Sequence, residues 1–390
     1  MDSPETKRIS VSIIVPTYCE AENLPPLITQ VADAFNARGW LWEIIVVDDN
    51  SPDATAAVLP ALAKNYPQVR FLIRKEDRGL SSAVLAGFAL ARFEYLVVMD
   101  ADLSHPPEMA PALVDPLLDN RADFVIGSRN VAGGRTESWG MFRWLNSAVA
   151  TALSRPFVGQ IRDSMAGFFA LRRQLLADCD TLNPIGYKIG LELIVKGRVR
   201  RIVEVPIVFR NRTRGKSKLT LAEQFRYLEH LSRLYDYQFP RGSPRVKFLI
   251  VCVCGLLVSL GAIALLVKVG HAGFLPALAL GLPAMILVTL LFFVRYVRTQ
   301  RDFIRMKHPY REFFLISCGE WCAGLLAGWA AHQVCGMLWS ALLALGALVV
   351  VRYVLRKILL HDVRGIRGQR LAPAKPAGAQ EKSPSVLGSS

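Results

Sequence analysis

Four apolar segments in the C-terminal half restrict most strongly what this chain can fold into. They cover about residues 248–267, 274–294, 313–331 and 337–354. Each has roughly 20 residues, enough for a helix to cross the hydrocarbon core of a bilayer, which is about 30 Å thick. Core helices of a soluble protein would be shorter and carry more charge. The sequence therefore predicts an all-α transmembrane domain with four helices over residues 246–361.

The distribution of basic residues predicts how this domain is oriented. The chain has 47 Lys and Arg residues against 32 Asp and Glu residues, a net charge of +15. Nucleic-acid-binding proteins share such a charge, but here the basic clusters flank the apolar segments. The loop between the second and third segments contains Arg295, Arg298, Arg301, Arg305, Lys307 and Arg311. Cytoplasmic loops carry this kind of excess, so we expect an integral membrane protein with both termini in the cytoplasm and no nucleic-acid partner.

Residues 1–219 alternate between strand and helix patterns, as is typical of an α/β domain. Strand-like apolar runs occur at residues 9–15, 43–47, 69–73, 95–99, 124–126 and 202–209. Helical patterns separate most of these runs, which predicts a mostly parallel sheet in a cytoplasmic domain. Residues 220–245 are expected to form an amphipathic juxtamembrane helix and a linker. Residues 362–390 are expected to form a disordered cytoplasmic tail.

A pair of acids follows the run at residues 95–99. Asp100 and Asp102 come directly after this predicted buried strand, and Pro106 and Pro107 then break the chain. The strand would carry both carboxylates to the carboxyl edge of the sheet, where such sheets bind ligands. Two hard oxygen donors there suit Mg²⁺ or Mn²⁺, with a diphosphate supplying further ligands. An isolated Asp-X-Asp sequence is more often a plain acidic turn, so the rest of the chain has to decide.

Polar residues follow other predicted strands as well. Residues 16–20 (PTYCE) end the first strand, and Asn23 and the prolines after it favour a helix start. Asp48 and Asp49 end the second strand, where they form either a polar turn or acceptors for ribose hydroxyls or a base. Gly79 opens a later helix, whose N-terminus either offers donors to phosphate or merely completes a turn.

Two further features allow two interpretations each. Residues 210–218 carry several Lys and Arg side chains around one Gly, which form either a solvated loop or an anion clamp; their place after the last predicted strand favours the clamp. Glu320 lies inside the third apolar segment, where an acid is costly and suggests either a function or a packing contact.

The cysteines fit a reduced cytosolic compartment. The seven cysteines show no disulfide or metal-binding pattern, and most lie in the apolar part of the chain, where free Cys behaves as a small hydrophobe. The first five residues are acidic and contain no apolar core, so we expect no cleaved signal peptide.

Taken together, these stretches resemble glycosyltransferase family 2, which has the GT-A fold. More narrowly, the chain resembles the polyprenol (dolichyl) phosphate mannose synthases that carry a four-helix membrane domain. The matching stretches are residues 16–20 (PTYCE), 47–53 (VDDNSPD), 99–108 (MDADLSHPPE), 127–129 (GSR), 186–188 (GYK) and 212–218 (RTRGKSK). Each is modest alone, but they occur in the family's order over residues 9–240. The resemblance implies a GT-A nucleotide-sugar-binding domain at residues 1–219.

The resemblance also implies roles for individual residues. The metal ligands would be Asp100, Asp102 and Ser104. The nucleotide-sugar site would comprise Pro16, Tyr18, Glu20, Val47, Asp48, Asp49, Asp100, Ala101, Asp102, Ser104, Arg129 and Arg212. The acceptor phosphate would be held by Arg129, Arg143, Arg212, Ser217 and Lys218. Catalysis would depend on Asp100, Asp102, Arg129, Arg212 and Lys218.

The implied reaction is inverting, metal-dependent transfer of mannose from GDP-mannose to a polyprenyl (dolichyl-type) phosphate, giving a β-linked product. The sequence departs from the family pattern at Cys19, where Asn is usual, at Ser104, where some relatives have Gln, and at Ser164 and Ala166. No departure removes a carboxylate or a cation of the implied site.

Three alternatives compete with this function. A UDP-sugar donor (glucose, galacturonic acid or an aminosugar) would keep the fold, although residues 103–107 (LSHPP) favour GDP-mannose. A processive polysaccharide synthase usually carries a Gln-X-X-Arg-Trp motif, which is missing from the sequence. A membrane transport or assembly protein with an inactive transferase domain is disfavoured by the intact Asp100, Asp102 and Arg212.

Overall fold

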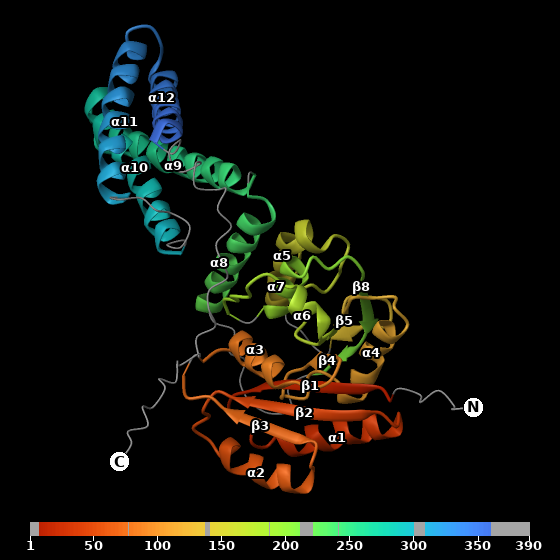
Figure 1. Ribbon diagram of the computed structural model, residues 1–390. Helices are drawn as coiled ribbons and strands as arrows, with labels where there is room; N and C mark the ends of the chain where they lie inside the picture. Colours follow the sequence, from red (N-terminus) through yellow and green to blue (C-terminus); the bar gives the residue numbers. More distant parts are fainter. Residues whose placement is uncertain are drawn as a thin grey trace, which may run out of the picture. The chain divides into compact units, whose positions relative to one another are not determined.

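The computed structural model describes residues 8–76, 78–136, 141–186, 188–210, 221–240, 242–299 and 309–359. The chain forms two compact units, Met1–Ser243 and Pro244–Ser390 (Figure 1). The first unit contains the sheet, and the second consists of helices among the described residues. Each unit is built around its own core.

A seven-stranded sheet organises the first unit. Its strand order is β3-β2-β1-β4-β7-β5-β8, and only β7 runs antiparallel to its neighbours. The strands are β1 (Ser10–Thr17), β2 (Leu41–Asp48), β3 (Val69–Ile73), β4 (Tyr95–Val98), β5 (Phe124–Ser128), β7 (Phe169–Arg172) and β8 (Ile202–Pro206). The predicted α/β class with a mostly parallel sheet is confirmed.

The single late strand predicted at residues 202–209 is wrong in one respect, because it divides in two. β8 ends at Pro206, and β9 (Val208–Phe209) leaves the main sheet to pair with β6 (Arg135–Thr136). Proline has no amide hydrogen and cannot continue a ladder as a donor. The amide of Ile207 still donates to the carbonyl of Ser128, which keeps the two pieces against β5.

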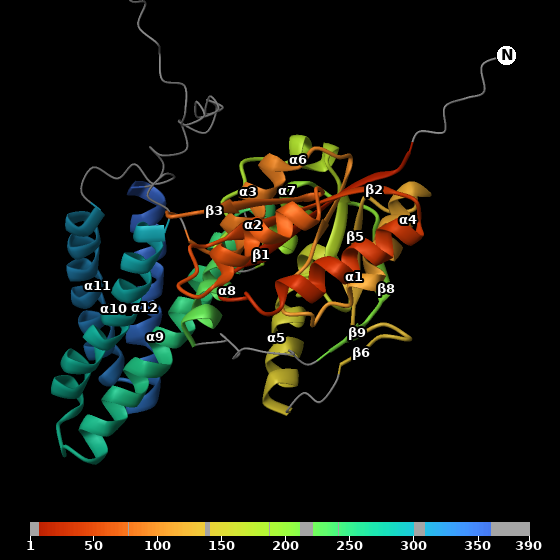
Figure 2. The same cartoon turned by 90° about the horizontal axis from the view of Figure 1, so that it is seen from below.

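Helices cover both faces of this sheet (Figures 1 and 2). Side chains alternate along β1, so that Ile13 and Val15 join one core cluster and Ile14 joins the other. The first cluster includes residues of α1, α2 and α4, and the second includes residues of α3, α7 and α8. The helices are α1 (Leu24–Ala37), α2 (Thr55–Asn65), α3 (Leu80–Leu90), α4 (Ala110–Leu118), α5 (Met141–Val158), α6 (Gln174–Asp178), α7 (Ile189–Lys196) and α8 (Leu221–Gln238), with a 3₁₀ turn at Pro107–Met109.

The start of α1 differs from its predicted cap. Asn23 precedes the helix as expected, and prolines occupy its first turn, but the Asn23 side chain makes no capping hydrogen bond. Its amide donates instead to Oε2 of Glu20, at 2.6 Å. Asn23 therefore stabilises the loop after β1 rather than the first turn of the helix.

The second unit contains the four predicted apolar helices. They are α9 (Ser243–Lys268), α10 (Phe274–Thr299), α11 (Pro309–His332) and α12 (Met337–Leu359), and each contains a span long and apolar enough to cross a membrane. Leu249, Leu257 and Leu265 on α9 are each 62% exposed. Such apolar surface is unfavourable in water, and a bilayer would cover it.

Glycines allow these helices to approach closely. A Cβ atom added at Gly324 of α11 would lie 2.1 Å from Leu348 of α12, and one added at Gly328 would lie 2.4 Å from Leu278 of α10. Small residues at such positions let helix backbones pack tightly, which drives association where lipid removes the hydrophobic effect.

Glu320 has a partner on the neighbouring helix. Arg352 of α12 donates from Nε to one carboxylate oxygen at 2.6 Å and from Nη2 to the other at 2.7 Å. The Arg352 guanidinium also lies 5.4 Å from the ring centroid of Phe313. The packing interpretation of Glu320 is therefore favoured, since both of its oxygens are used between α11 and α12.

We expect Gly324→Ala to lower the thermal stability of the detergent-solubilised protein. The added methyl group must displace Leu348, and overpacking of this kind costs about 1–3 kcal/mol. Gly346→Ala on α12 is the matched control, because no atom lies within 4 Å of its added Cβ and Ala is the better helix former by roughly 1 kcal/mol. Equal melting temperatures for the two variants would contradict the close packing at Gly324.

Candidate functional site

The sheet brings the predicted polar residues to one edge. Thr17 at the end of β1 is paired with Asp48 at the end of β2, and Ile14 is paired with Val98, just before Asp100. Because these three strands are parallel, the segments that follow them emerge at the same carboxyl edge. The carboxyl end of β5, which leads to Arg129, opens onto this edge as well.

The second acid of the Asp-X-Asp pair is held by its own turn. Asp102 is 5% exposed, and its Oδ1 accepts hydrogen bonds from the amide of Ser104 at 3.0 Å and from the hydroxyl at 2.6 Å. Leu103 has a φ of 59°, an unusual conformation for an apolar residue. Ser104 is fully buried and donates its hydroxyl to Asp102, which favours an orienting role over the metal-ligand role expected from the sequence. The Asp100 side chain is 32% exposed.

His105 accepts a hydrogen bond from the backbone of the same turn. The amide of Asp100 donates to its Nδ1 at 3.1 Å, so this nitrogen carries no proton. The ring stacks on Phe168 at 5.1 Å between centroids and meets Phe209 edge-on at 5.5 Å. Burial, aided by Arg129, lowers the pKa of His105 against the opposing effect of Asp100, Asp102 and Asp163, so the neutral form is favoured.

The two carboxylates fit a divalent metal that shares its ligands with a substrate. Within the described ranges, no group of three or more His, Cys, Asp or Glu side chains could hold a metal alone. Mg²⁺ is commonly bound by one or two carboxylates together with substrate phosphates and water. Asp100 and Asp102 supply that number of hard oxygen ligands, so the donor set suits an ion that arrives with a diphosphate.

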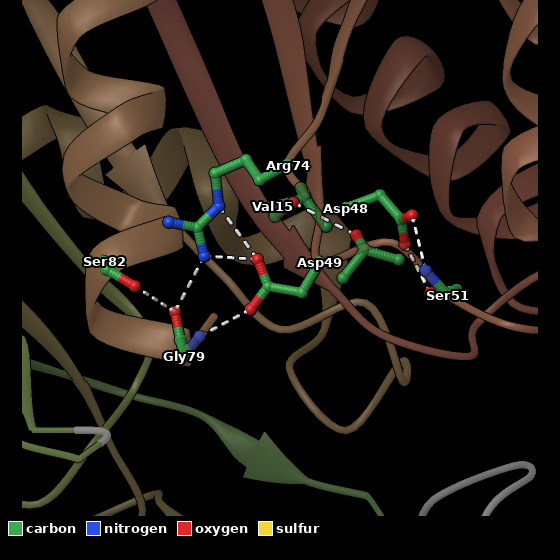
Figure 3. A network of polar contacts seen from close by, with 8 residues as sticks. Val15, Asp48, Asp49, Ser51, Arg74, Gly79 and Ser82 are labelled. Atoms are coloured by element: carbon green, nitrogen blue, oxygen red, sulfur yellow. Dashed lines mark hydrogen bonds and ion pairs between the residues drawn. The ribbon is translucent and has the colours of Figure 1, made fainter. Parts of the chain in front are cut away.

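The acids after β2 form a separate, internally bonded network (Figure 3). Ser51 donates its amide and hydroxyl to Asp48, at 2.9 and 2.5 Å. Asp49 forms an ion pair with Arg74 and accepts the amide of Gly79 at 2.7 Å. Asp49 therefore binds the N-terminus of α3, and this favours a turn at Gly79 over a phosphate site. Both carboxylates hold the segments that follow β2 and β3 at the carboxyl edge of the sheet.

Arg129 is locked to an acid that the sequence analysis did not select. Its Nε and Nη2 donate to the two oxygens of Asp163, both at 2.7 Å, and its amide donates to the same carboxylate at 3.1 Å. Asp163 is completely buried, and its own amide donates to Glu204 of β8 at 2.9 Å. The guanidinium lies 5.0 Å from the Phe209 ring centroid. Asp163 directly precedes Ser164, one of the departures from the family pattern, but no spacing in the sequence connects it with Arg129.

Lys188 is a second residue that the sequence analysis did not assign to the site. Its ammonium donates to the carbonyl of Met165 at 2.5 Å. Burial, aided by Arg129, lowers the pKa of Lys188 to about 8, while Asp163 and Asp100 oppose the shift. Met165 lies in the turn closed by the hydrogen bond from the amide of Ala166 to the carbonyl of Asp163, at 3.2 Å. The amine is therefore bound to the turn that carries the partner of Arg129, at the carboxyl edge of the sheet, here called the active edge. The stretch at residues 186–188 pointed to it only as part of a motif.

The basic loop begins beside the Asp-X-Asp turn. The amide of Arg210 donates to the carbonyl of Ser104 at 3.0 Å, and its guanidinium binds Glu108 at 2.5 Å. The predicted acceptor residues that follow, Arg212, Ser217 and Lys218, lie outside the described residues, as does the side chain of Arg143. The structure thus places Arg210, at the start of this loop, beside the Asp-X-Asp turn.

We expect Asp163→Asn to destabilise the protein by about 3–5 kcal/mol, the usual cost of removing one partner from a buried ion pair. The Arg129 side chain is only 10% exposed and would keep an uncompensated charge. Asp119→Asn is the control, since its pair with Arg121 is more than half exposed on both sides and such pairs contribute at most about 1 kcal/mol. Thermal unfolding of both variants measures the difference. A similar loss of stability in Asp163→Asn and Asp119→Asn would contradict a large contribution of the Arg129–Asp163 pair to stability.

Two family models match this chain. Residues 12–179 match the model of glycosyl transferase family 2, and residues 247–360 match that of the GtrA/DPMS transmembrane domain. A solved structure of glucosyl-3-phosphoglycerate synthase from Mycobacterium tuberculosis aligns with a TM-score of 0.44 at 20% identity, over 59% of this chain and 79% of its own.

Curated relatives are closer in sequence. The dolichol-phosphate mannosyltransferase of Pyrococcus furiosus is 43% identical over 265 residues, which are 67% of this chain and 74% of the relative. The protein of the same name from Saccharomyces cerevisiae is 41% identical, over 59% of this chain and 89% of its own length. The chain is therefore an enzyme of glycosyltransferase family 2 and belongs to the dolichol-phosphate mannosyltransferases, with a membrane domain of the GtrA/DPMS type.

Proposed function

We propose that the protein transfers mannose from GDP-mannose to a polyprenyl (dolichyl-type) phosphate, with inversion at the anomeric carbon. The supporting observation is the gathering of Asp100, Asp102, Arg129 and Lys188 at one sheet edge in a chain of this family. Paired acids and fixed cations at one place suit the transfer of a sugar between two phosphate-bearing molecules. The name shared by the relatives supports mannose and a dolichol-type lipid.

The donor would lie along the ends of β1, β2 and β4. Pro16, Tyr18, Glu20, Val47, Asp48, Asp49 and Ala101 would line the nucleotide site. Tyr18 is 39% exposed at the rim, where its ring can stack on a base. Both oxygens of Asp48 and Oδ2 of Asp49 each accept one internal hydrogen bond and keep a second lone pair for a ribose or base donor, whereas Oδ1 of Asp49 already accepts two donors of Arg74.

Asp100 and Asp102 would hold Mg²⁺ or Mn²⁺ against the donor diphosphate, with Ser104 orienting Asp102. When bound, such an ion acts as a Lewis acid that neutralises the charge of the leaving nucleoside diphosphate. His105 keeps the backbone of Asp100 in place through its neutral ring, so the carboxylate is presented without further rearrangement.

The acceptor phosphate is already anionic near neutral pH, so the site needs no strong base. It needs cations that keep the phosphate in line with the anomeric carbon. Arg129 and Lys188 lie at the edge, and Arg143, Arg212, Ser217 and Lys218 remain proposed members of this group. Direct attack by a phosphate oxygen inverts the anomeric centre, so an α-linked donor gives a β-linked product.

The four-helix unit suits this acceptor, because an isoprenoid chain stays in the bilayer while its phosphate must be reached from the aqueous side. The excess of Arg and Lys residues in the sequence between α10 and α11 supports a cytoplasmic position for the termini and the catalytic unit.

The proposal is tested by incubating the detergent-solubilised protein with labelled nucleotide-sugars and polyprenyl phosphate. We expect the enzyme to transfer mannose from GDP-mannose, to give a product whose β linkage is seen by NMR, and to transfer no sugar from the UDP-sugars. A clear preference for a UDP-sugar would replace the donor proposal, and transfer with retention would exclude direct attack.

Asp102→Asn should lower the transfer rate by at least about a hundredfold. Loss of a residue that only hydrogen-bonds to a metal ligand costs up to about a hundredfold, and a direct ligand should cost at least as much. The substitution removes one of the two carboxylates that fit the ion. The exposed Asp33→Asn on α1 serves as control. Wild-type transfer that continues at full speed in excess chelator would refute the metal-dependent site.

Lys188 should give kcat/KM for the donor an alkaline limb. The amine is charged below its pKa of about 8 and neutral above it, so a diphosphate loses a cationic contact as the pH rises through this value. In Lys188→Arg, whose guanidinium stays charged, the limb near pH 8 should disappear, and in Lys188→Gln the rate should be low throughout. An unchanged limb in both variants would show that Lys188 does not titrate in the reaction.

A further inference from the structure

Residues 183–186 and Lys188, here called the Lys188 segment, are held by side chains rather than by a regular backbone ladder. The described residues of this segment form no helix or strand. The amide of Asn183 donates to Oε1 of Glu192 at 2.8 Å, and the amide of Ile185 donates to Nδ1 of His230 at 2.9 Å. Two backbone donors of the segment therefore end on one residue of α7 and one residue of α8.

Glu192 and His230 are buried side by side, at 1% and 2% exposure. Their facing atoms, Oε2 and Nε2, are 3.9 Å apart, beyond hydrogen-bond distance. Neither atom has a hydrogen-bond partner within the part of the chain that the structure describes. Buried polar atoms without partners cost free energy, and an apolar pair of similar shape would be cheaper. Glu192 also forms an ion pair with Lys196 at 2.5 Å through Oε1. Among the described residues His230 has no such compensation, and the hydrogen bond that it accepts from the amide of Ile185 gives a reason for its buried imidazole.

The hydrogen bonds define the state of the imidazole. Because Ile185 donates to Nδ1, that nitrogen is unprotonated and the proton of the neutral ring lies on Nε2. Burial lowers the pKa of His230; Glu192 opposes the shift, and Lys196 and Arg233 add to it. A protonated ring would present a donor to the amide of Ile185, so the bond exists only in the neutral form.

The same histidine belongs to the helix that follows the basic loop. α8 begins directly after residues 211–220, which contain Arg212 and Lys218. It packs on α5, where the hydroxyl of Tyr227 donates to the carbonyl of Ala150 at 2.9 Å. His230 therefore connects the helix that follows the proposed clamp residues in the sequence with the segment that ends at Lys188.

We propose, building on the transfer reaction above, that His230 is a positioning residue: its neutral imidazole, with Glu192, fixes the Lys188 segment to α8 and so holds the Lys188 ammonium at the active edge. His230 touches no reacting group in this arrangement. Its effect on catalysis passes through Lys188.

Two isomeric substitutions separate this role from simple packing. In His230→Asn the amide oxygen can occupy the place of Nδ1 and accept the amide of Ile185, whereas in His230→Gln the polar group reaches the place of Nε2 instead. We expect kcat/KM for GDP-mannose to fall at least about fivefold in His230→Gln, the lower cost of one unsatisfied buried donor. His230→Asn should stay within about twofold of wild type on the same basis.

A double-mutant cycle tests the route through Lys188. In the Lys188→Gln background, His230→Gln should change kcat/KM by less than about twofold, because coupled residues are non-additive. Tyr235→Phe on the same helix, which loses only a bond to the carbonyl of Leu153, should leave kcat/KM unchanged. Additive losses in the cycle, or equal losses in the Asn and Gln variants, would overturn the positioning role.

Failure of the reaction itself is distinguishable. A wild-type protein that transfers no sugar from any donor would refute the proposed function, whereas an active wild type with an active His230→Gln would refute only the positioning role. If His230→Gln does not fold, the pH profile decides. Wild-type kcat/KM should fall at acid pH as the imidazole is protonated, and His230→Asn should keep its activity to lower pH; coincident acid limbs would overturn the inference.

Discussion

The buried ion pair between Arg129 and Asp163 is the interaction on which the active edge depends. This edge gathers acids and cations within one small region, and unrestrained side chains of opposite charge would collapse onto one another. Asp163 takes two aligned donors of the guanidinium and the amide of the same residue. A bidentate pair of this kind fixes orientation as well as charge. Because Glu204 in turn accepts the amide of Asp163, the position of Arg129 is anchored to β8.

The other charged groups of the edge are restrained in the same way. Asp102 accepts two bonds from Ser104, Asp48 accepts two from Ser51, and Asp49 binds the start of α3. Nearly every carboxylate near the strand ends thus has its direction set by a local donor before any substrate arrives. Such preorganisation removes the cost of reorienting dipoles during the reaction. It also explains why so many polar residues can lie at the end of a buried sheet.

The membrane unit is stabilised by different forces. Its glycines allow contact between helix backbones, and the pair of Glu320 with Arg352 joins α11 to α12. In an apolar surrounding an acid without a partner would be very costly, so the two residues depend on each other. The sequence placed Glu320 in a span but could not name its partner, because Arg352 is 32 positions away and only helix packing brings them together.

The sequence by itself determined the elements with local signals: the four apolar spans, the strand and helix alternation, and the polar strand ends at Asp48, Asp100 and Asp102. Periodicity and span length depend on neighbouring residues, and parallel strands must deliver their carboxyl ends to one edge. Only the tertiary structure decided which side chains restrain one another there. Asp163, Lys188 and His230 act through partners 23 to 45 positions away. No local pattern records such distances, since they are set by how helices and loops pack on the finished sheet.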